Sequence, residues 1–243
     1  MYVSDGILVN QRKFALELVE EFGCTDSKPT SSPLPLGLKL FSDVGSLLSD
    51  PSLYMRLIDK LNFLTHTRPD LAYTVQHLSQ FMQTPEQPHL DAALHTVCYI
   101  KGLSGLRLHF SSHSSFSMVA FCDSDWASCF DSRRSVSGFF ITLGSCPISW
   151  KSKKQTIVSL SSAEAEYRSV RRLVAELTWL CQFLEDMDVT NLTLIDVYCD
   201  NQSAIQIAKN PVSHEWTKHI ELDWHFVREK LQDGLILLHY IPF

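Results

Sequence analysis

The stretches A-F-C-D-S-D-W (Ala120 to Trp126) and V-Y-C-D-N (Val197 to Asn201) decide the fold of this sequence. Each contains an apolar run typical of a strand buried on both faces, and each run ends on a carboxylate, Asp123 in the first and Asp200 in the second. A carboxylate at the end of a buried strand is costly to keep ionised unless a cation joins it. The simplest cation is a hard divalent metal ion, because such ions prefer oxygen ligands.

A long helix is predicted between these two strands. It opens at S-S-A-E-A-E-Y (Ser161 to Tyr167), which contains a capping box, and apolar residues then recur on one helical face. If the two strands are neighbours, a helix packed across the sheet brings Glu166 to Asp123 and Asp200. Three such carboxylates can hold two Mg2+ or Mn2+ ions, which activate a bound water and stabilise the leaving oxygen in phosphodiester hydrolysis. The alternative is that each acid is an ordinary surface or capping residue.

The rest of the pattern predicts two parts with different architecture. Residues 1–112 contain a short extended piece and then mainly helical patterns, and the serine-rich segment Ser111–Ser115 is the expected linker. Residues 113–243 mix strands and helices, which predicts an α/β domain with a mixed sheet and helices packed on it. In this part, strands are expected at Phe139–Leu143, Ile148–Trp150, Leu192–Cys199 and Leu235–Ile241, and helices at Ser203–Lys209 and Thr217–Gln232.

The composition indicates a folded protein that does not span a membrane. The 243 residues are 45% hydrophobic and 20% charged, and no apolar run approaches the length that a bilayer requires. The N-terminus lacks the pattern of a secretory signal, so we expect an intracellular protein, cytoplasmic or nuclear, that is not secreted. The seven cysteines are scattered without a C-x-x-C pair, which favours reduced thiols over a disulfide framework or a thiolate zinc site.

Basic residues are concentrated near the predicted acidic site. The net charge of −6 argues against a general nucleic-acid binder, but residues 133–172 contain eight Lys or Arg against two acids, a local charge of +6. This segment is either a solvated surface or a strip that contacts phosphates. In the second interpretation, Arg134, Lys153 and Lys154 contact the substrate.

Six motifs of the second half are long and follow one another in a specific order. They are A-F-C-D-S-D-W (120–126), R-R-S-V-S-G-F (133–139), I-S-W-K-S-K-K-Q (148–155), S-S-A-E-A-E-Y (161–167), Y-C-D-N-Q-S-A (198–204) and T-K-H-I-E (217–221). In this order and spacing they resemble the ribonuclease H domain of copia-type retrotransposon Pol polyproteins, over most of residues 116–242. The resemblance implies a ribonuclease H-like mixed sheet with packed helices.

Four motifs of the first half resemble the part of the same polyprotein just upstream, the thumb and connection of its reverse transcriptase. They are G-I-L-V-N-Q-R-K-F (6–14), T-R-P-D-L-A-Y (67–73), L-S-Q-F-M (78–82) and Y-I-K-G (99–102). The resemblance implies a slice of a Pol polyprotein, with the end of the reverse transcriptase at 1–112 and a C-terminally truncated ribonuclease H-like domain at 113–243. The palm and fingers of the same reverse transcriptase are then expected partners.

The resemblance also implies roles for individual acids. Asp123, Glu166 and Asp200 match the catalytic, metal-binding acids of the family, with Asp125 as the alternative to Asp123. The implied substrate is the RNA strand of an RNA–DNA hybrid, and the implied cofactor is a pair of Mg2+ or Mn2+ ions, with no small-molecule cofactor and no membrane partner.

Recognition of RNA requires contacts to its 2′-hydroxyl groups. Asn201, Gln202 and Ser203 follow Asp200 directly and are candidates for this contact, although capping of the next helix is an equally good role for them. His219 either approaches the substrate or orders its own helix.

Two catalytic elements of the family fall outside the sequence. The polymerase motif Tyr-x-Asp-Asp would lie upstream of Met1, so we expect no polymerase activity. The late acid of the ribonuclease H domain would follow Phe243, and Glu221 and Asp223 are the stand-ins to consider for this fourth carboxylate. Low or absent activity is therefore an expectation, and two interpretations compete with the enzyme. One is an inactive relic that retains the fold and weak hybrid binding, and the other is a subdomain that acts only in assembly with a polymerase partner.

Three histidines and two tryptophans are also candidates, as zinc ligands and as base-stacking residues respectively. His214, His219 and His225 have a spacing compatible with zinc, but no cysteine follows Cys199, so a His-His-Cys-Cys site cannot be completed. We interpret these histidines as helix and loop residues. Trp126 and Trp150 are interpreted as packing residues rather than as platforms for base stacking.

Overall fold

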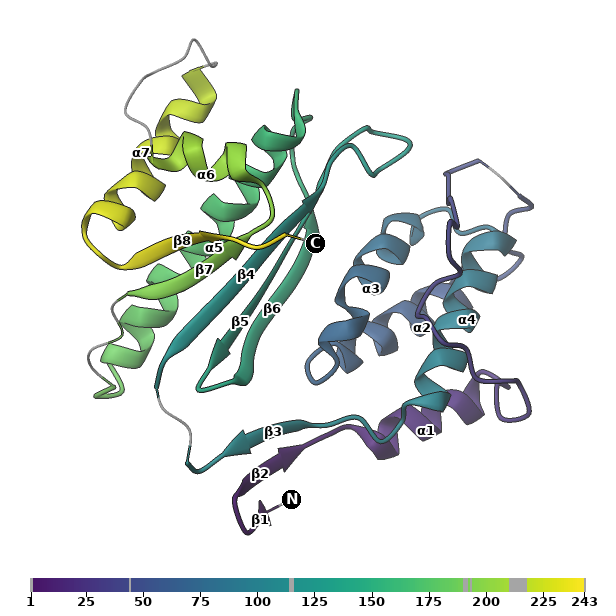
Figure 1. Ribbon diagram of the computed structural model, residues 1–243. Coiled ribbons are helices and arrows are strands. Elements are labelled where there is room, and N and C mark those ends of the chain that lie inside the picture. Colours follow the sequence, from purple (N-terminus) through teal and green to yellow (C-terminus); the bar gives the residue numbers. More distant parts are fainter. Residues whose placement is uncertain are drawn as a thin grey trace. The chain divides into compact units, whose positions relative to one another are not determined.

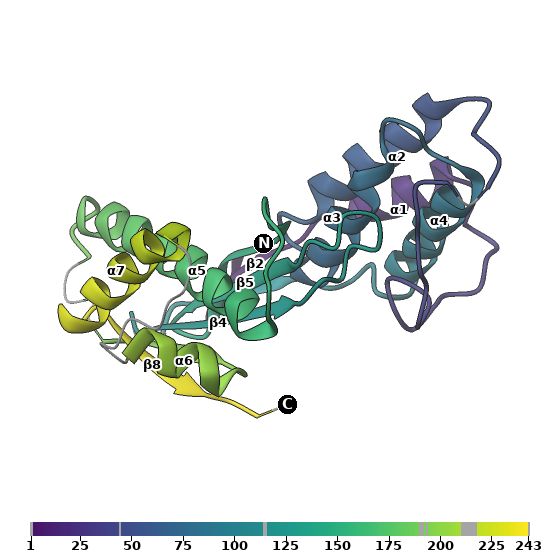
Figure 2. The same cartoon turned by 90° about the horizontal axis from the view of Figure 1, so that it is seen from above.

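The computed structural model describes residues 2–43, 45–113, 116–189, 192, 194–209 and 218–242, with side chains from 225 onward in the last range. The chain divides into two compact units, Met1–His113 and Ser114–Phe243. Figures 1 and 2 show the helices and strands of both units.

The first unit is mainly helical, as its sequence pattern predicts. Its elements are β1 (Tyr2–Val3), β2 (Gly6–Val9), α1 (Arg12–Glu21), α2 (Pro51–Leu64), α3 (Ala72–Leu78), α4 (Gln87–Gly102) and β3 (Leu108–Ser111), with 3-10 turns at Pro69–Leu71 and Ser79–Phe81. The strands form an antiparallel sheet in the order β1-β2-β3. Helix α2 begins after Asp50, whose side chain accepts a hydrogen bond from the N–H of Ser52 at 3.0 Å. Its buried face, including Leu57 and Leu61, contributes to an apolar core formed by the helices.

Two sequence motifs of the first unit meet in one polar cluster. The Arg68 side chain is 5% exposed, and its guanidinium donates to Asp70, from Nε to Oδ1 at 2.9 Å and from Nη2 to Oδ2 at 2.7 Å. It also donates to the carbonyl oxygen of Leu103 at 3.1 Å, while the Tyr99 hydroxyl donates to Asp70 Oδ2 at 3.0 Å. A two-pronged Arg–carboxylate pair has a fixed geometry, so this cluster ties the T-R-P-D turn to the end of α4.

The second unit is a mixed α/β fold. Its elements are β4 (Met118–Asp125), β5 (Val136–Leu143), β6 (Cys146–Lys154), α5 (Ser162–Glu185), β7 (Ile195–Cys199), α6 (Gln202–Lys209), α7 (Lys218–Gln232) and β8 (Ile236–Tyr240). The sheet has the order β6-β5-β4-β7-β8. β4, β5 and β6 are antiparallel neighbours, whereas β7 is parallel to both β4 and β8. The predicted mixed sheet with packed helices is confirmed.

The helices of this unit pack against one another and against the sheet (Figure 1). Helix α5 lies across β4 and β5, and α6 and α7 pack against α5 and β8. Alternate strand residues point into the core between them, and Ala120, Ile141 and Val197 are fully buried there. The apolar face of α5, with Val170, Leu177 and their neighbours, fills the other side of this core.

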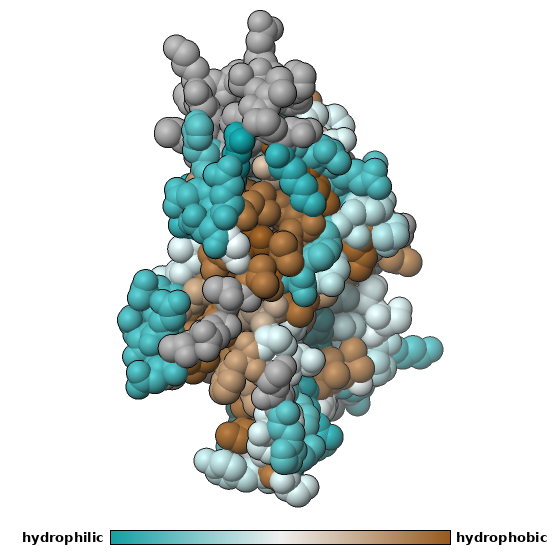
Figure 3. All heavy atoms as spheres, turned by 60° about the vertical axis from the view of Figure 1, so that its left-hand side comes forward, coloured by the Kyte–Doolittle hydropathy of each residue, from teal (hydrophilic) through white to brown (hydrophobic). Residues whose placement is uncertain are grey.

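On the opposite face of the sheet, aromatic and histidine side chains lie next to one another across neighbouring strands. Strand pairing aligns one ring on each of the five strands, namely Trp150, Phe140, Phe121, Tyr198 and His239. The ring centroids of Phe121 and Tyr198 are 5.2 Å apart, and those of Tyr198 and His239 are 5.1 Å apart. Trp150 is half-buried in this row, which agrees with a packing role. Seen with the left-hand side of Figure 1 brought forward, another part of the surface carries apolar residues that gather into a patch with a hydrophilic border (Figure 3).

Some strand boundaries differ from the sequence-based expectation. β4 continues through Asp125, so Asp123 lies inside the strand rather than after it. β6 extends past Trp150 to Lys154, because β5 offers a pairing partner as far as Val136. An edge strand such as β6 tolerates lysines, since one side of it stays open to solvent.

None of the helices in the described part of the chain combines the length and apolar character needed to cross a bilayer. All seven cysteines lie in the described part of the chain, and none of them forms a disulfide bond.

Candidate metal centre

Strand register places two of the predicted acids side by side. The last residue pair between β4 and β7 is Cys122 with Cys199, and Asp123 and Asp200 follow these two residues directly. Because β4 and β7 are parallel, the residues after this pair emerge at the same edge of the sheet. The topology therefore brings together two carboxylates that are far apart in the sequence.

Helix α5 adds a third carboxylate to this edge. Ser161 caps the helix, since its Oγ accepts the N–H of Glu164 at 3.2 Å. The Glu164 carboxylate returns the bond to the N–H of Leu160 at 2.9 Å, one residue before the expected position in a capping box. Glu166 is 4% exposed, and its Oε1 accepts the N–H of Ser124 at 3.0 Å. This last bond fastens the start of α5 to β4 within the D-S-D motif.

The donor atoms at this edge fit a divalent cation. One ligand atom each from Glu166, Cys199 and Asp200 lie within 4.8 Å of one another. Oδ1 of Asp200 is buried and has no hydrogen-bond partner in the described part of the chain, which costs free energy unless another group joins it. A hard ion such as Mg2+ or Mn2+ is the group that a carboxylate oxygen in such a cluster would bind.

The acids in this cluster raise one another's pKa. The pKa of Glu166 is raised from its ordinary value of 4.5 to about 9, first by burial and then by the neighbouring Cys199, Asp123 and Asp200. The pKa of Asp123 is raised by burial and then by repulsion from Asp125 and Asp200. Such repulsion acts only at short range, and a bound cation would relieve it.

The two aspartates of the D-S-D motif differ in their relation to the other acids. Asp123 and Asp125 are two residues apart in β4 and so lie on the same face of the sheet. The pKa of Asp125 is raised by burial, whereas that of Asp123 is raised by Asp200 as well. Asp123 is therefore the aspartate of this motif that interacts electrostatically with Asp200, whereas the ligand atoms within 4.8 Å of one another belong to Glu166, Cys199 and Asp200.

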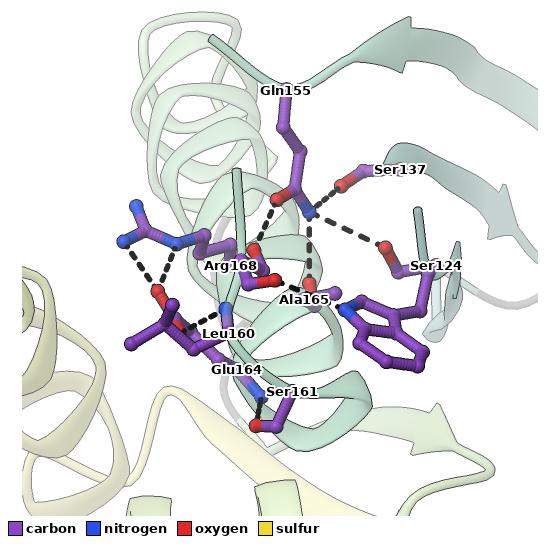
Figure 4. Close-up of polar contacts among 10 residues, drawn as sticks. Ser124, Ser137, Gln155, Leu160, Ser161, Glu164, Ala165 and Arg168 are labelled. Carbon is purple, nitrogen blue, oxygen red and sulfur yellow. Dashed lines mark hydrogen bonds and ion pairs between the residues drawn. The ribbon is translucent and has the colours of Figure 1, made fainter. Parts of the chain in front are cut away.

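A buried glutamine, Gln155, joins β4, β5 and α5 (Figure 4). Gln155 is 4% exposed, and its amide nitrogen donates to Ser124 Oγ at 3.3 Å, Ser137 Oγ at 2.8 Å and the carbonyl oxygen of Ala165 at 3.0 Å. Its amide oxygen accepts the Ser159 hydroxyl at 2.8 Å. Ser124 is the residue whose N–H binds Glu166, and Ala165 precedes Glu166 in α5. Gln155 therefore holds both the strand that bonds to Glu166 and the helix that carries it.

The residues that follow Asp200 differ in their contacts and in their exposure to solvent. Oδ1 of Asn201 accepts the N–H of Ala204 at 2.9 Å, so this side chain caps α6. Gln202 and Ser203 are exposed in the first turn of that helix. The side chains of the other proposed late residues, His214, His219, Glu221 and Asp223, lie outside the described residues, whereas His225 is exposed.

The basic residues do not form one continuous surface. Register pairs Lys153 with Ser137 and Lys154 with Val136, so the two lysines point to opposite faces of the sheet. Val136 in turn pairs with Asp125, which places Lys154 on the face of the D-S-D acids.

Other members of the basic segment have contacts within the unit. Lys154 Nζ lies 3.6 Å from Cys129 Sγ, and Arg172 donates to the carbonyl oxygen of Lys153 at 3.2 Å. Arg168 is bound to the carboxylate of Glu164 at 2.9 Å, and Arg134 is half-buried. Trp126 is 51% exposed and donates from Nε1 to the carbonyl oxygen of Ser159 at 3.0 Å, a contact that holds the loop before α5.

No sequence pattern predicts a role for Cys199 or Gln155, yet the Cys199 thiol lies beside the Glu166 and Asp200 carboxylates and Gln155 bonds to the residues around Glu166. For Cys199, the available signal was its position directly before Asp200. A single glutamine has no spacing pattern that predicts a role. The role of Gln155 is recognised only from its contacts with Ser124, Ser137 and Ala165 in the folded chain.

The strand order and the packed helices give the second unit the ribonuclease H-like fold that the motifs predict. No family model matches this chain. It is 36% identical, over 239 residues and 98% of its length, to the retrovirus-related Pol polyprotein from transposon RE1 of Arabidopsis thaliana. It is 33% identical, over 234 residues and 93% of its length, to the corresponding polyprotein from transposon TNT 1-94 of Nicotiana tabacum. The chain belongs to the family of retrovirus-related Pol polyproteins from transposons, as the motifs predict.

The chain spans 16% of the RE1 polyprotein and 17% of the TNT 1-94 polyprotein. Among solved structures, it resembles the foamy viral protease-reverse transcriptase dRH in complex with double-stranded DNA. This similarity has a TM-score of 0.52 at 10% identity and covers 96% of this chain and 35% of that chain. At such low identity it is a similarity of fold alone.

Proposed function

We propose that the second unit is a ribonuclease H-type nuclease that hydrolyses the RNA strand of RNA–DNA hybrids with two Mg2+ or Mn2+ ions. The observation that carries this proposal is the group formed by Glu166 and Asp200, in which the buried Asp200 Oδ1 has no hydrogen-bond partner among the described residues. Asp123 follows the strand pair at the same sheet edge and supports the proposal. The family of the chain supports it, because the motifs of the second unit resemble the ribonuclease H domain of such polyproteins, for which the RNA strand of a hybrid is the implied substrate. The work of the domain would take place inside the cell.

In this proposal, Asp123, Glu166 and Asp200 are the residues that hold the metal ions. Bound divalent ions supply an activated water and stabilise the leaving oxygen of a phosphodiester. Burial and the neighbouring acids raise the pKa of Glu166 to about 9, so its carboxyl would hold a proton at neutral pH without metal and would release it on holding the ions. The Ser124 N–H and the Gln155 network keep its carboxylate in place during this change.

The substrate side of the proposal rests on residues that reach solvent beside the acids. Gln202 and Ser203 are exposed at the start of α6, next to Asp200, and are candidates for contacts to 2′-hydroxyl groups. Asn201 contributes by capping that helix. Lys154 stands on the face of the D-S-D acids and is the best placed of the basic residues to contact a phosphate.

The first unit extends the proposal to the neighbouring part of the polyprotein. We assign residues 1–112 to the thumb and connection of the reverse transcriptase, which would bind the palm and fingers of the same polyprotein. Its mainly helical fold and its T-R-P-D and Y-I-K-G motifs, joined through Arg68, Asp70 and Tyr99, support this assignment.

The test is cleavage of a labelled RNA strand in an RNA–DNA hybrid by the full chain, with Mg2+ and separately with Mn2+. Asp200→Asn is the inactive control, because it keeps the size of the side chain and removes its charge. Cleavage by the natural chain and not by the control is expected. Absence of cleavage in both metals, by a chain shown to be folded, would overturn the proposal.

A further inference from the structure

A thiol lies inside the acid cluster. Cys199 is the last residue of β7 and is fully buried. Its Sγ lies with one oxygen each of Glu166 and Asp200 inside a group of donor atoms within 4.8 Å of one another, and it donates to Glu166 Oε2 at 3.9 Å. The cluster therefore offers one sulfur and two oxygens to a single ion.

We propose that this centre also binds a thiophilic divalent ion, of which Zn2+ is the representative, through Cys199, Glu166 and Asp200. The inference rests on the proposed function, since the two carboxylates are those assigned to Mg2+, and it names a second class of ion that competes for them. Asp200 is available to either ion, because its buried Oδ1 has no hydrogen-bond partner among the described residues.

Coordination chemistry separates the two classes of ion at this centre. Zn2+ accepts thiolate and carboxylate ligands together, in sites with three protein ligands and one open position for water. With metal–ligand distances of about 2.0–2.3 Å, the ligand atoms of such a site lie about 3.3–3.7 Å apart, so the group at Cys199 needs only a small contraction. Mg2+ requires oxygen ligands in octahedral geometry and gains nothing from a thiolate.

Binding of Zn2+ exchanges the proton of one thiol for the metal ion. The Cys199 thiol releases its proton to solvent as the sulfur–metal bond forms, and the metal replaces the hydrogen bond from this thiol to Glu166. The occupied centre has its carboxylates committed to Zn2+, which leaves them unable to hold Mg2+. Cys122 lies opposite Cys199 in the strand pair. Its Sγ donates to the carbonyl oxygen of Tyr198 at 3.7 Å and is also hydrogen-bonded to the Cys199 thiol, but Cys122 is not part of the ligand group.

The test uses Co2+ as a spectroscopic substitute for Zn2+, with the full chain under reducing conditions. The natural chain is expected to show sulfur-to-cobalt charge-transfer absorption in the near ultraviolet, and Zn2+ is expected to remove it. Cys199→Ser should abolish this absorption and weaken Zn2+ binding by at least about tenfold, with little change in Mg2+ binding. Cys146→Ser is the matched control, because it removes another buried thiol that is remote from the acids, and it should leave the spectrum unchanged.

Two results would overturn the inference: no charge-transfer absorption in the natural chain, or absorption that persists undiminished in Cys199→Ser. Because the first result needs no variant, the inference stays testable even if Cys199→Ser does not fold. Asp200→Asn gives a second check and should lose the absorption while it keeps every cysteine. The spectra do not depend on RNA cleavage, so a failure of this inference is distinct from a failure of the proposed nuclease.

Discussion

The sharpest prediction concerns the stability of the metal-free protein when Glu166 is made neutral. Its folded-state pKa of about 9 exceeds its ordinary value of 4.5, so between these values the folded state binds the proton more tightly than the unfolded state does. The stability of the natural chain therefore falls as the pH rises through this window. Each pH unit above 4.5 costs about 1.4 kcal/mol, which gives about 3 kcal/mol at pH 7 as an upper bound, because water entering the cluster screens part of the effect.

Glu166→Gln should remove this penalty, because glutamine does not ionise. Its amide oxygen can still accept the Ser124 N–H, and its amide nitrogen can donate to the partnerless oxygen of Asp200. We expect the variant without metal to be up to about 3 kcal/mol more stable than the natural chain at pH 7, and nearly equal to it at pH 4.5. Added Mg2+ should stabilise the natural chain and have little effect on the variant.

The assay is urea unfolding in the presence of a chelator at several pH values, followed by tryptophan fluorescence. All five tryptophans lie between residues 126 and 224, so the signal reports the second unit alone. Glu164→Gln is the matched control. Glu164 is equally buried in the same helix but is bound to Arg168, so its neutralisation should lower stability. A Glu166→Gln variant that is less stable than the natural chain at pH 7, with the same slope against pH, would refute the reasoning.

Three further predictions follow from the same structure. Gln155→Leu should lower the free energy of unfolding of the second unit by about 1–3 kcal/mol and weaken Mg2+ binding by about tenfold. Unchanged Mg2+ binding in calorimetry would contradict the positioning role of Gln155. Lys154→Ala should weaken hybrid binding and reduce the salt slope by about one, whereas Lys153→Ala, on the other face, should have a smaller effect; equal slopes in filter binding would count against this assignment. Arg68→Ala should destabilise the first unit by about 3 kcal/mol, because Asp70 loses its ion-pair partner and keeps only the hydrogen bond from Tyr99. Far-ultraviolet circular dichroism should then show an unfolding transition at lower urea concentration, while the transition seen by tryptophan fluorescence is unchanged. A shift of the fluorescence transition instead would argue against this role of Arg68.

The sequence alone determined the identity of the acids and the local structure around them. Asp123 and Asp200 each mark the end of an apolar run, and the capping box before Glu166 marks the start of α5, because these signals depend on neighbouring residues. The order of the motifs was enough to predict the family, and the alternation of strands and helices was enough to predict the mixed sheet.

Only the tertiary structure decided which side chains meet. The parallel register of β4 and β7 sets Asp123 beside Asp200, and it also turns Cys199 toward Glu166. Side chains alternate between the two faces of a strand, so the assignment of Lys153 and Lys154 to opposite faces depends on where β6 ends and on its pairing with β5. Contacts between residues far apart in sequence come from strand pairing and helix packing, and no local pattern in the chain contains that information.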